Sequence, residues 1–448
     1  MSELALKLIR EAKATKATTI DLANCGLTEL PDELFELVWL EELYLGRDGL
    51  IYDFESKEQT WIESKNEGVG NNIDYISDKI EALKRLKIIF NNYYSGESTG
   101  LKNLDALGNL KNLNSLYVSG AQVSDLSPLR KLGGLKVLDF SGTQVTDLSA
   151  LRGLVDLEFL NIRDTQVKEL TPLKKLTKLQ ELRFSDSRVN ELTPLKGLVE
   201  LKVLWADCPE VADLIPIANL TLLEDLQLFR TAVKDLNPLR GLVNLQDISV
   251  SGTNVVSLSP LKHLQHLGTI WFEDTKVSDL SPLKNLIERN PDIRLEFANC
   301  PLTNPPLEIA IQGNEAILNY WQQIEDQGGT QTINEAKLII VGEGDTGKTT
   351  LFNKLVDPTF DLSRTKTEET QGINIHEGLE IREGFRANLW DFGGQELQYM
   401  THQFFLTPNA VYVLMLGARG EAPNLAYWFK IISLLGKDKS GGKVSLII

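Results

Sequence analysis

Residues 157–178 read LEFLNIRDTQVKELTPLKKLTK, and this 22-residue unit recurs along the chain with its apolar positions in register. A leucine stands at the first position of each unit, and a leucine or isoleucine follows three residues later. A strict period of this length is typical of a solenoid, because one unit cannot bury its apolar face alone and must stack on its neighbours. The first-position leucines are Leu113, Leu135, Leu157, Leu179, Leu201, Leu223, Leu245 and Leu267.

Polar residues and prolines keep the same phase and mark the turns of each unit. A hydroxyl at the ninth position can satisfy backbone groups of a turn, and it comes from Thr143, Thr165, Ser187, Thr231, Thr253 and Thr275. Proline opens the return segment of each unit, where a missing N–H donor costs little, and Ala150 alone breaks the series. The unit LxxLxLxxTxVxDLxPLxxLxx resembles the leucine-rich repeat, in which the LxL segment is a short strand. The expected fold is therefore α/β, beginning with a leucine-rich-repeat solenoid.

The limits of the array can be placed from the same pattern. A helical N-terminus precedes a first unit that begins near residue 18, and between about 46 and 100 the period is lost, which predicts an insertion with irregular repeats. The last unit ends at Leu302, and residues 313–327 place apolar side chains on one helical face, which predicts a capping helix. We expect residues 1–327 to form the repeat domain, residues 328–334 a linker, and residues 335–448 a second domain.

Composition and charge exclude several classes of protein. The 448 residues include 42% hydrophobic and 24% charged side chains, which is ordinary for a folded chain of more than one domain. The net charge of -16 disfavours nucleic acid as a partner, since it repels a phosphate backbone. The longest apolar run, residues 410–416, is far below the ~20 residues of a membrane span. No export signal and only three cysteines favour a reducing cytoplasm.

The cysteines and the paired histidines raise the question of a metal or redox site. Cys25 and Cys300 occupy the ninth position of their units, where a buried thiol packs like a small apolar group. Cys208 stands apart from both in the sequence. His263 and His266 lie in a return segment without further ligands nearby. We expect buried cysteines with a packing role and solvated surface histidines.

One face of the repeat sheet can be read from the alternation of side chains along each strand. The residue between the two core leucines should point to the concave face with its alternate neighbours, among them Asp139, Asn161, Arg163, Arg183, Asp207 and Glu273. Aromatic residues beside arginines are typical of binding surfaces, although the rings could instead shield one another on the curved sheet. The predicted surface for a protein partner comprises Tyr117, Phe159, Trp205, Phe229 and Trp271.

The second domain opens with an aliphatic strand that runs into a glycine-rich loop. Residues 337–341 read KLIIV and residues 342–349 read GEGDTGKT, which satisfies the P-loop pattern GxxxxGK[ST] in its required context. Such a loop directs backbone N–H groups at phosphate oxygens beside a helix N-terminus. Lys348 should reach the β- and γ-phosphates, and the Thr349 hydroxyl should bind Mg²⁺. The predicted nucleotide contacts are Gly342, Glu343, Gly344, Asp345, Thr346, Gly347, Lys348, Thr349 and Thr350.

A second motif follows the strand expected at residues 385–390. Residues 391–396 read DFGGQE and resemble the DxxGQ switch of Ras-like GTPases. The resemblance implies that Asp391 holds Mg²⁺ through water, that the Gly394 N–H contacts the γ-phosphate, and that Gln395 is catalytic and orients the attacking water. Residues 370–373, TQGI, resemble switch I of that family. Their resemblance implies that Thr370 binds Mg²⁺ and senses the γ-phosphate.

Leucine-rich repeats placed before a Ras-like domain with DFGGQE, followed by residues 401–405, THQFF, resemble the bacterial-type Roco family. The resemblance implies a Roc GTPase domain followed by a COR domain through which the full-length protein would form a homodimer. We read residues 410–416 as the fourth strand, 427–435 as a helix and 444–448 as the fifth strand. The chain is then expected to stop before the guanine-reading loop and before COR, so that guanine specificity is implied by the resemblance alone.

The leading functional hypothesis is a switch that binds GTP and Mg²⁺ and hydrolyses GTP to GDP and phosphate, with repeats that bind a protein partner. An interaction scaffold that binds nucleotide without hydrolysing it remains open, as does a P-loop ATPase regulator. Arg419, after the fourth strand, could supply positive charge to a γ-phosphate or be an ordinary loop arginine.

Overall fold

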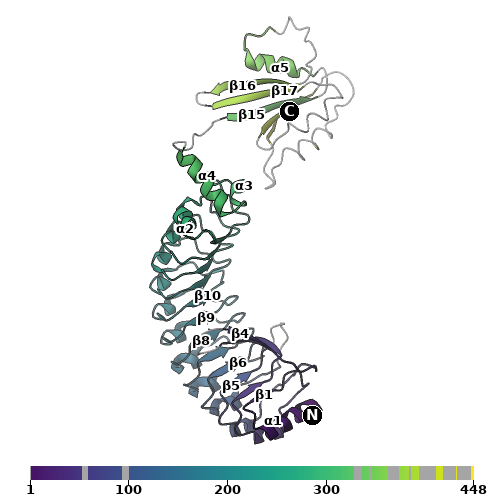
Figure 1. Ribbon diagram of the computed structural model, residues 1–448, viewed down its shortest axis with the longest axis vertical. Coiled ribbons are helices and arrows are strands. Elements are labelled where there is room, and N and C mark those ends of the chain that lie inside the picture. Colours follow the sequence, from purple (N-terminus) through teal and green to yellow (C-terminus); the bar gives the residue numbers. More distant parts are fainter. Residues whose placement is uncertain are drawn as a thin grey trace. The chain divides into compact units, whose positions relative to one another are not determined.

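The protein divides into two compact units, Met1–Gln327 and Gly328–Ile448 (Figure 1). The computed structural model describes residues 2–52, 59–92, 100–326, 335–342, 346–361, 373–382, 385–392, 410–416, 430 and 445–447. Among the helices of these residues, none has the length and apolar character needed to cross a bilayer. The fold class predicted from the sequence is confirmed. A repeat solenoid precedes an α/β unit whose sheet contains parallel and antiparallel strands.

The first unit is built around one parallel sheet in which every repeat contributes one strand (Figure 1). Neighbouring strands pair in the register of the sequence repeat, so that Leu160 lies opposite Leu182 and Leu182 opposite Leu204. Each strand of this sheet is only three residues long. Its central residue enters the core, and the chain then turns back toward the next repeat. The strands in sheet order are β1 (Thr19–Asp21), β2 (Glu42–Tyr44), β5 (Ile88–Phe90), β6 (Ser115–Tyr117), β7 (Val137–Asp139), β8 (Phe159–Asn161), β9 (Glu181–Arg183), β10 (Val203–Trp205), β11 (Asp225–Gln227), β12 (Asp247–Ser249), β13 (Thr269–Trp271) and β14 (Arg294–Glu296).

The return segments are short 3₁₀ helices, several of which follow an aspartate-capped turn. The Asp147 carboxylate accepts the Ser149 N–H at 2.8 Å, and hydrogen bonds from the Ser149 hydroxyl and N–H hold the pKa of Asp147 below its ordinary value. The helix with Ala150 in place of proline forms like the others. The 3₁₀ helices are η1 (Asp32–Glu36), η2 (Asp78–Ala82), η3 (Asp105–Asn109), η4 (Ser127–Lys131), η5 (Ser149–Gly153), η6 (Thr171–Leu173), η7 (Thr193–Leu195), η8 (Ile215–Ile217), η9 (Asn237–Gly241), η10 (Ser259–Leu261) and η11 (Ser281–Leu283).

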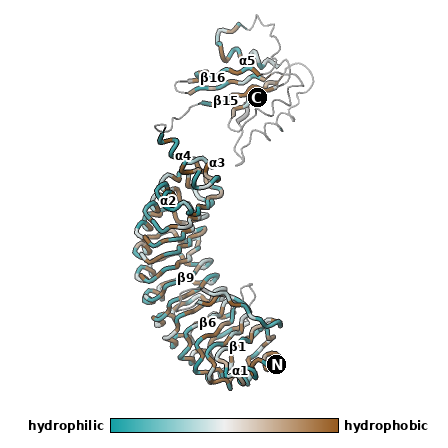
Figure 2. Tube along the Cα trace, viewed as in Figure 1, coloured by the Kyte–Doolittle hydropathy of each residue, from teal (hydrophilic) through white to brown (hydrophobic). Residues whose placement is uncertain are grey.

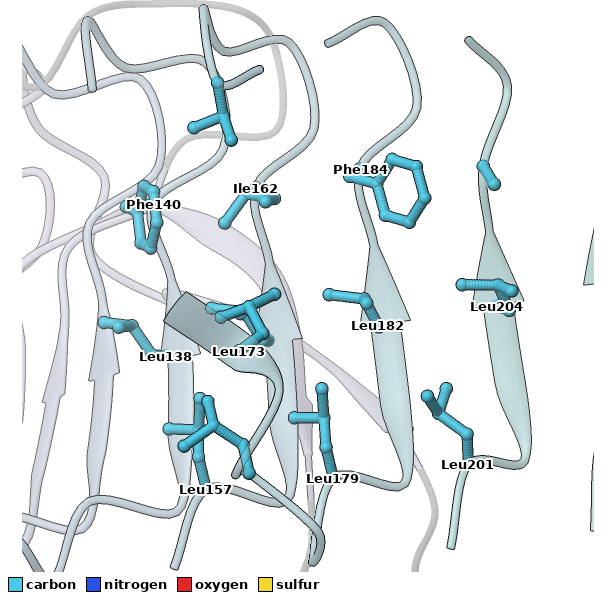
Figure 3. Packing of buried hydrophobic residues seen from close by; sticks show 14 of the residues in the cluster. Leu138, Phe140, Leu157, Ile162, Leu173, Leu179, Leu182, Phe184, Leu201 and Leu204 are labelled. Atoms are coloured by element: carbon cyan, nitrogen blue, oxygen red, sulfur yellow. The ribbon is translucent and has the colours of Figure 1, made fainter. Parts of the chain in front are cut away.

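One apolar core runs through the whole array, between the sheet and the return segments. Figure 3 shows Leu182, Phe184 and Leu204 of successive strands packed in rows, and Figure 2 shows hydrophobic and hydrophilic residues alternating along each repeat. Beside this core, the Thr231 hydroxyl donates to the Leu228 carbonyl oxygen at 2.9 Å. The threonines at 143, 165, 253 and 275 make the same bond, which confirms that the ninth position satisfies a turn carbonyl.

The cysteines and histidines lie where the sequence analysis expects them. All three cysteines are free and buried, and the Cys300 thiol donates to the Phe272 carbonyl oxygen at 3.0 Å, as the Thr275 hydroxyl also does. Burial raises the pKa of Cys25 to about 11. Such a thiol stays protonated and unreactive at neutral pH. His263 and His266 are exposed.

Helices cover both ends of the repeat core. At the N-terminal end lies α1 (Glu3–Thr15), whose Ala5, Ile9 and Ala12 join the core. At the other end lie α2 (Lys284–Arg289), α3 (Leu307–Ala310) and α4 (Asn314–Asp326). In α4, Ile317 and Trp321 are buried against the last repeats, and the Trp321 Nε1–H donates to Asn304 Oδ1 at 2.9 Å. The terminal leucines are thereby kept out of water, as the open ends of a solenoid require.

The irregular insertion folds onto the concave face. An antiparallel hairpin of β3 (Asp48–Tyr52) and β4 (Gln59–Glu63) packs on strands β5–β8 through a second apolar cluster (Figure 1). The Tyr52 ring lies 5.4 Å from the Phe159 ring, between centroids, and the Tyr52 N–H donates to the Tyr117 hydroxyl at 2.9 Å. Tyr117 and Phe159 are only 1% and 5% exposed. Their assignment to a partner surface is therefore wrong, because the hairpin covers them.

The second unit has a five-stranded sheet in the order β16-β17-β15-β18-β19. Its central strand β15 (Glu335–Gly342) is parallel to β17 (Phe385–Phe392) and β18 (Ala410–Met415), whereas the edge strand β16 (Ile373–Arg382) is antiparallel to β17. Strand β19 (Ser445–Ile447) pairs with β18. Helix α5 (Lys348–Val356) packs its Phe352 against Ile340 and Leu389. The helix expected at residues 427–435 lies outside the described residues, apart from Lys430.

The position of the hairpin can be tested by removing the ring on which it packs. Phe159→Ala should loosen the hairpin and lower the free energy of unfolding by about 3 kcal/mol, as for other buried aromatic truncations. Hydrogen exchange measured by mass spectrometry should become faster in residues 48–52 and 59–63 and remain slow in β10–β13. Phe229→Ala is the matched control, because this concave aromatic residue is 41% exposed. Equal effects of both variants would show that the hairpin does not depend on Phe159.

Candidate functional site

The candidate site lies where β15 meets α5, at the carboxyl end of the central strand. Strands β17 and β18 lie on opposite sides of β15, so the strand order reverses at β15. In open α/β sheets, ligands bind at the carboxyl ends of the strands where the order reverses. Gly342 ends β15 with a φ of 150°, and a Cβ there would meet the Met415 carbonyl oxygen at 2.5 Å. Gly347 precedes α5 with a φ of 82°, which favours glycine. Both glycines are thus required by the turn of the backbone.

The two sequence motifs meet in a hydrogen bond between their side chains. The Thr349 hydroxyl, in the first turn of α5, donates to Asp391 Oδ2 at 2.8 Å. Asp391 belongs to β17, pairs with Ile340 of β15 and is 0% exposed. The side chains lie 42 residues apart in the sequence, and the parallel pairing of β15 and β17 brings them to the same edge of the sheet. Lys348, beside Thr349, is buried to 6% exposure.

Several predicted site residues cannot be placed. Thr346, Gly347, Lys348, Thr349 and Thr350 lie together at the start of α5. The P-loop residues Glu343, Gly344 and Asp345, the switch residues Thr370, Gly394 and Gln395, and Arg419 lie outside the described residues.

The described residues fit a magnesium nucleotide. A helix that begins with the sequence Gly-Lys-Thr, directly after a central strand, presents backbone N–H groups and a lysine to an anion. A hydroxyl and a carboxylate already within hydrogen-bonding distance are hard oxygen donors of the kind that Mg²⁺ prefers. A buried carboxylate is costly unless it is paired or coordinates a cation, so the position of Asp391 agrees with this use.

On the repeat unit, the concave face outside the hairpin keeps three of the predicted aromatic residues accessible. Trp205 and Trp271 are partly exposed, and Phe229 is exposed with the Arg230 guanidinium 4.7 Å from its ring centroid. The predicted polar residues Asn161, Arg163, Asp207 and Glu273 are also partly exposed, whereas Asp139 and Arg183 are buried. The accessible aromatic residues thus belong to the repeats of β10, β11 and β13.

Carboxylates line this remaining surface more densely than the sequence analysis expects. Asp225 accepts hydrogen bonds from Trp205 Nε1–H at 2.9 Å and Gln227 Nε2–H at 2.6 Å, and burial raises its pKa. Burial also raises the pKa of Asp207, which accepts the Phe229 N–H at 2.7 Å. Asp225 and Asp247 also occupy concave positions in the sequence pattern, two residues before Gln227 and Ser249, although the prediction did not name them.

Two family models match the chain. The model described as "Ras of Complex, Roc, domain of DAPkinase" matches residues 337–447, and the model of a leucine-rich repeat region matches residues 112–302. The two matches follow the same order as the two units of the structure.

Curated relatives match part of the chain. A Roc-COR-CHAT protease from an unidentified prokaryote is 30% identical over 33% of this chain and 16% of its own length. The probable serine/threonine-protein kinase roco11 of Dictyostelium discoideum is 33% identical over 32% of this chain and 10% of its own length. The chain thus spans less than a fifth of the length of these relatives. ADP-ribosylation factor-like protein 3 of Chlamydomonas reinhardtii is 34% identical over 25% of this chain and 60% of its own length.

Solved structures agree with the fold of the repeat unit. An internalin from Listeria monocytogenes matches with a TM-score of 0.54 and 23% identity, over 66% of this chain and 82% of that chain. This likeness concerns the fold alone. The repeats, the Roc match and the Roco relatives together identify the family. The chain is a member of the Roco family, with leucine-rich repeats followed by a Roc domain.

Proposed function

We propose that the chain is a molecular switch that binds GTP, hydrolyses it to GDP and phosphate, and couples the bound nucleotide to a protein partner of the repeats. The observation that carries the proposal is the hydrogen bond between Thr349 and Asp391 beside the buried Lys348. It unites the P-loop and the DxxGQ motif at one edge of the sheet. The Roc match supports guanine as the base.

Each residue of the site has a distinct role in this proposal. The backbone N–H groups from Gly342 to Thr350 surround the phosphates, and Lys348 supplies a positive charge to the β- and γ-phosphates. Thr349, Thr370 and Asp391 hold Mg²⁺, which neutralises charge on the phosphate oxygens. Gly394 offers its N–H to the γ-phosphate, and Gln395 orients the attacking water.

The change of conformation between the GTP and GDP states arises because the contacts of Thr370 and Gly394 require the γ-phosphate. The segments around Thr370 and Gln395 are ordered by contacts with that group and are released once it has left. The repeats then supply the surface that a partner recognises. A nucleotide-binding scaffold without turnover is the alternative outcome of the experiments below.

Removal of the lysine charge tests nucleotide binding. Lys348→Ala should abolish binding of GTP, because no other described cation lies at the start of α5. Isothermal calorimetry with GTP, with ATP as competitor, measures the affinity and the base preference. Lys354→Ala, in the last turn of the same helix, is the control for helix stability. Unchanged GTP affinity in Lys348→Ala would remove this residue from the site, and stronger binding of ATP would favour an ATPase regulator.

Hydrolysis is tested separately through the residue that orients water. Gln395→Leu should leave GTP affinity within a few-fold and slow single-turnover hydrolysis on the order of tenfold or more, because water positioning matters mainly in the transition state. Measurement of phosphate release after rapid mixing gives the rate. Binding without turnover by the unmodified chain would support the scaffold instead. Normal turnover by the variant would assign the water to another residue.

A further inference from the structure

The concave face contains the same arrangement of side chains twice, three repeats apart. Trp205 of β10 and Trp271 of β13 are separated by 66 residues, and their flanking strands have the same register, with Arg183 opposite Trp205 and Ser249 opposite Trp271. The residues around the two tryptophans correspond as well. The corresponding pairs are Glu181 and Asp247, Ser185 and Ser251, and Asp207 and Glu273.

The first arrangement holds an arginine that belongs to the chain itself. The Arg183 guanidinium carbon lies 3.9 Å from the Trp205 ring centroid, and its Nη2 forms an ion pair with Glu181. Arg183 is only 8% exposed, so the ring and the carboxylate together hold a nearly buried cation. Stacking on tryptophan and pairing with a carboxylate are both favourable for a planar guanidinium. This face of the sheet can therefore hold an arginine between a tryptophan and an acid.

The second arrangement has the ring and the acids but lacks the arginine. Ser249, a residue that is 6% exposed and has only a short side chain, stands where Arg183 stands in the first. Within the part of the chain that the structure describes, no lysine or arginine lies over the Trp271 ring. Asp247 and Glu273 likewise form no ion pair with the described residues. The negative charge around Trp271 is thus not neutralised as it is around Trp205.

The other side of Trp271 does not supply the missing cation. Glu296 of β14 lies opposite Trp271, and Arg294 is the charged residue next to it on the same strand. The Arg294 Nε–H donates to Glu296 Oε1 at 2.6 Å, and the arginine side chain is 68% exposed. Arg294 therefore pairs with Glu296 on its own strand, whereas Asp247 and Ser249 lie on β12, on the other side of β13.

We propose that the site formed by Asp247, Ser249, Trp271 and Glu273 binds an arginine side chain of a partner polypeptide. The guanidinium lies over Trp271 on the side of Ser249 and donates to Asp247 and Glu273, as Arg183 does to Glu181. Arginine is preferred over lysine because its flat, weakly hydrated head can stack and donate at the same time. This inference rests on the proposed partner-binding role of the repeats and is independent of nucleotide binding.

The test uses three labelled peptides of equal length in which glycine alternates with arginine, lysine or citrulline. Fluorescence anisotropy with the whole chain at physiological ionic strength measures binding. The arginine peptide should bind about tenfold more tightly than the lysine peptide, because only arginine stacks and donates together. The citrulline peptide has the same shape without the charge and should not bind measurably.

Variants then locate the binding. Trp271→Leu and Asp247→Asn should each weaken binding of the arginine peptide about five- to tenfold. Ser249→Arg should abolish it, because the new side chain takes the place of the partner's arginine just as Arg183 fills the first arrangement. The control Glu200→Gln should bind normally, because it removes an exposed charge outside the concave face.

The outcomes separate this site from general charge attraction and from the nucleotide switch. Equal binding of the arginine and lysine peptides, normal binding by Ser249→Arg or Trp271→Leu, or failure of the unmodified chain to bind the arginine peptide would each overturn the proposal. GTP binding is measured on the same preparations. Its loss without a change in peptide binding would count against the switch alone, and the reverse result would count against the arginine site alone.

Discussion

The stacking of inward leucines from one repeat onto the next is the interaction on which the rest of the repeat unit depends. Burial of a leucine side chain contributes about 1.5–3 kcal/mol, but only if a neighbouring repeat covers it. Leu182 has Leu160 on one side and Leu204 on the other, and all three are fully buried. The first and last leucines have no such second neighbour within the sheet. Helices α1 and α4 therefore close the ends, with Ile9 and Trp321 in contact with the same core.

This stack also determines what the concave face can do. The leucines take one set of alternating positions on every strand, so the other set is free to carry any chemistry. Near the N-terminal end that set is aromatic and is buried beneath the β3–β4 hairpin, with Tyr52 against Phe159. Burial raises the pKa of Tyr52 to about 12, which keeps its phenol neutral. Towards the C-terminal end the same positions carry tryptophans and carboxylates that are partly exposed. The concave face thus has one part that is buried beneath the hairpin and another part that is exposed to solvent.

In the Roc unit, the pairing of parallel strands is the constraint that positions the functional residues. In a parallel sheet the carboxyl ends of adjacent strands lie at one edge, so residues far apart in the sequence meet there. Thr349 follows β15 and Asp391 ends β17, and the pairing of these strands sets their separation. The glycines at 342 and 347 allow the backbone to turn sharply between strand and helix. The site therefore follows from strand order together with two residues that lack a side chain.

The sequence alone determined those features that depend on local pattern. The period of 22 specifies which residues enter the core, because a fixed spacing returns the chain to the same phase in every repeat. It also predicted the threonine hydroxyl bonds, such as that of Thr231, since donor and acceptor lie three residues apart. The P-loop could be recognised for the same reason, as its glycines, lysine and threonine are consecutive.

Only the tertiary structure decided the contacts between distant segments. Tyr117 has the pattern of an exposed concave residue, yet the hairpin buries it, because the insertion has no period from which its packing site could be read. Arg183 and Trp205 belong to different repeats, and only their opposition across β9 and β10 brings the guanidinium onto the ring, whereas Ser249 stands at that position opposite Trp271. A sequence pattern gives the phase of each side chain, but partners across the fold depend on which strands and loops come to lie side by side.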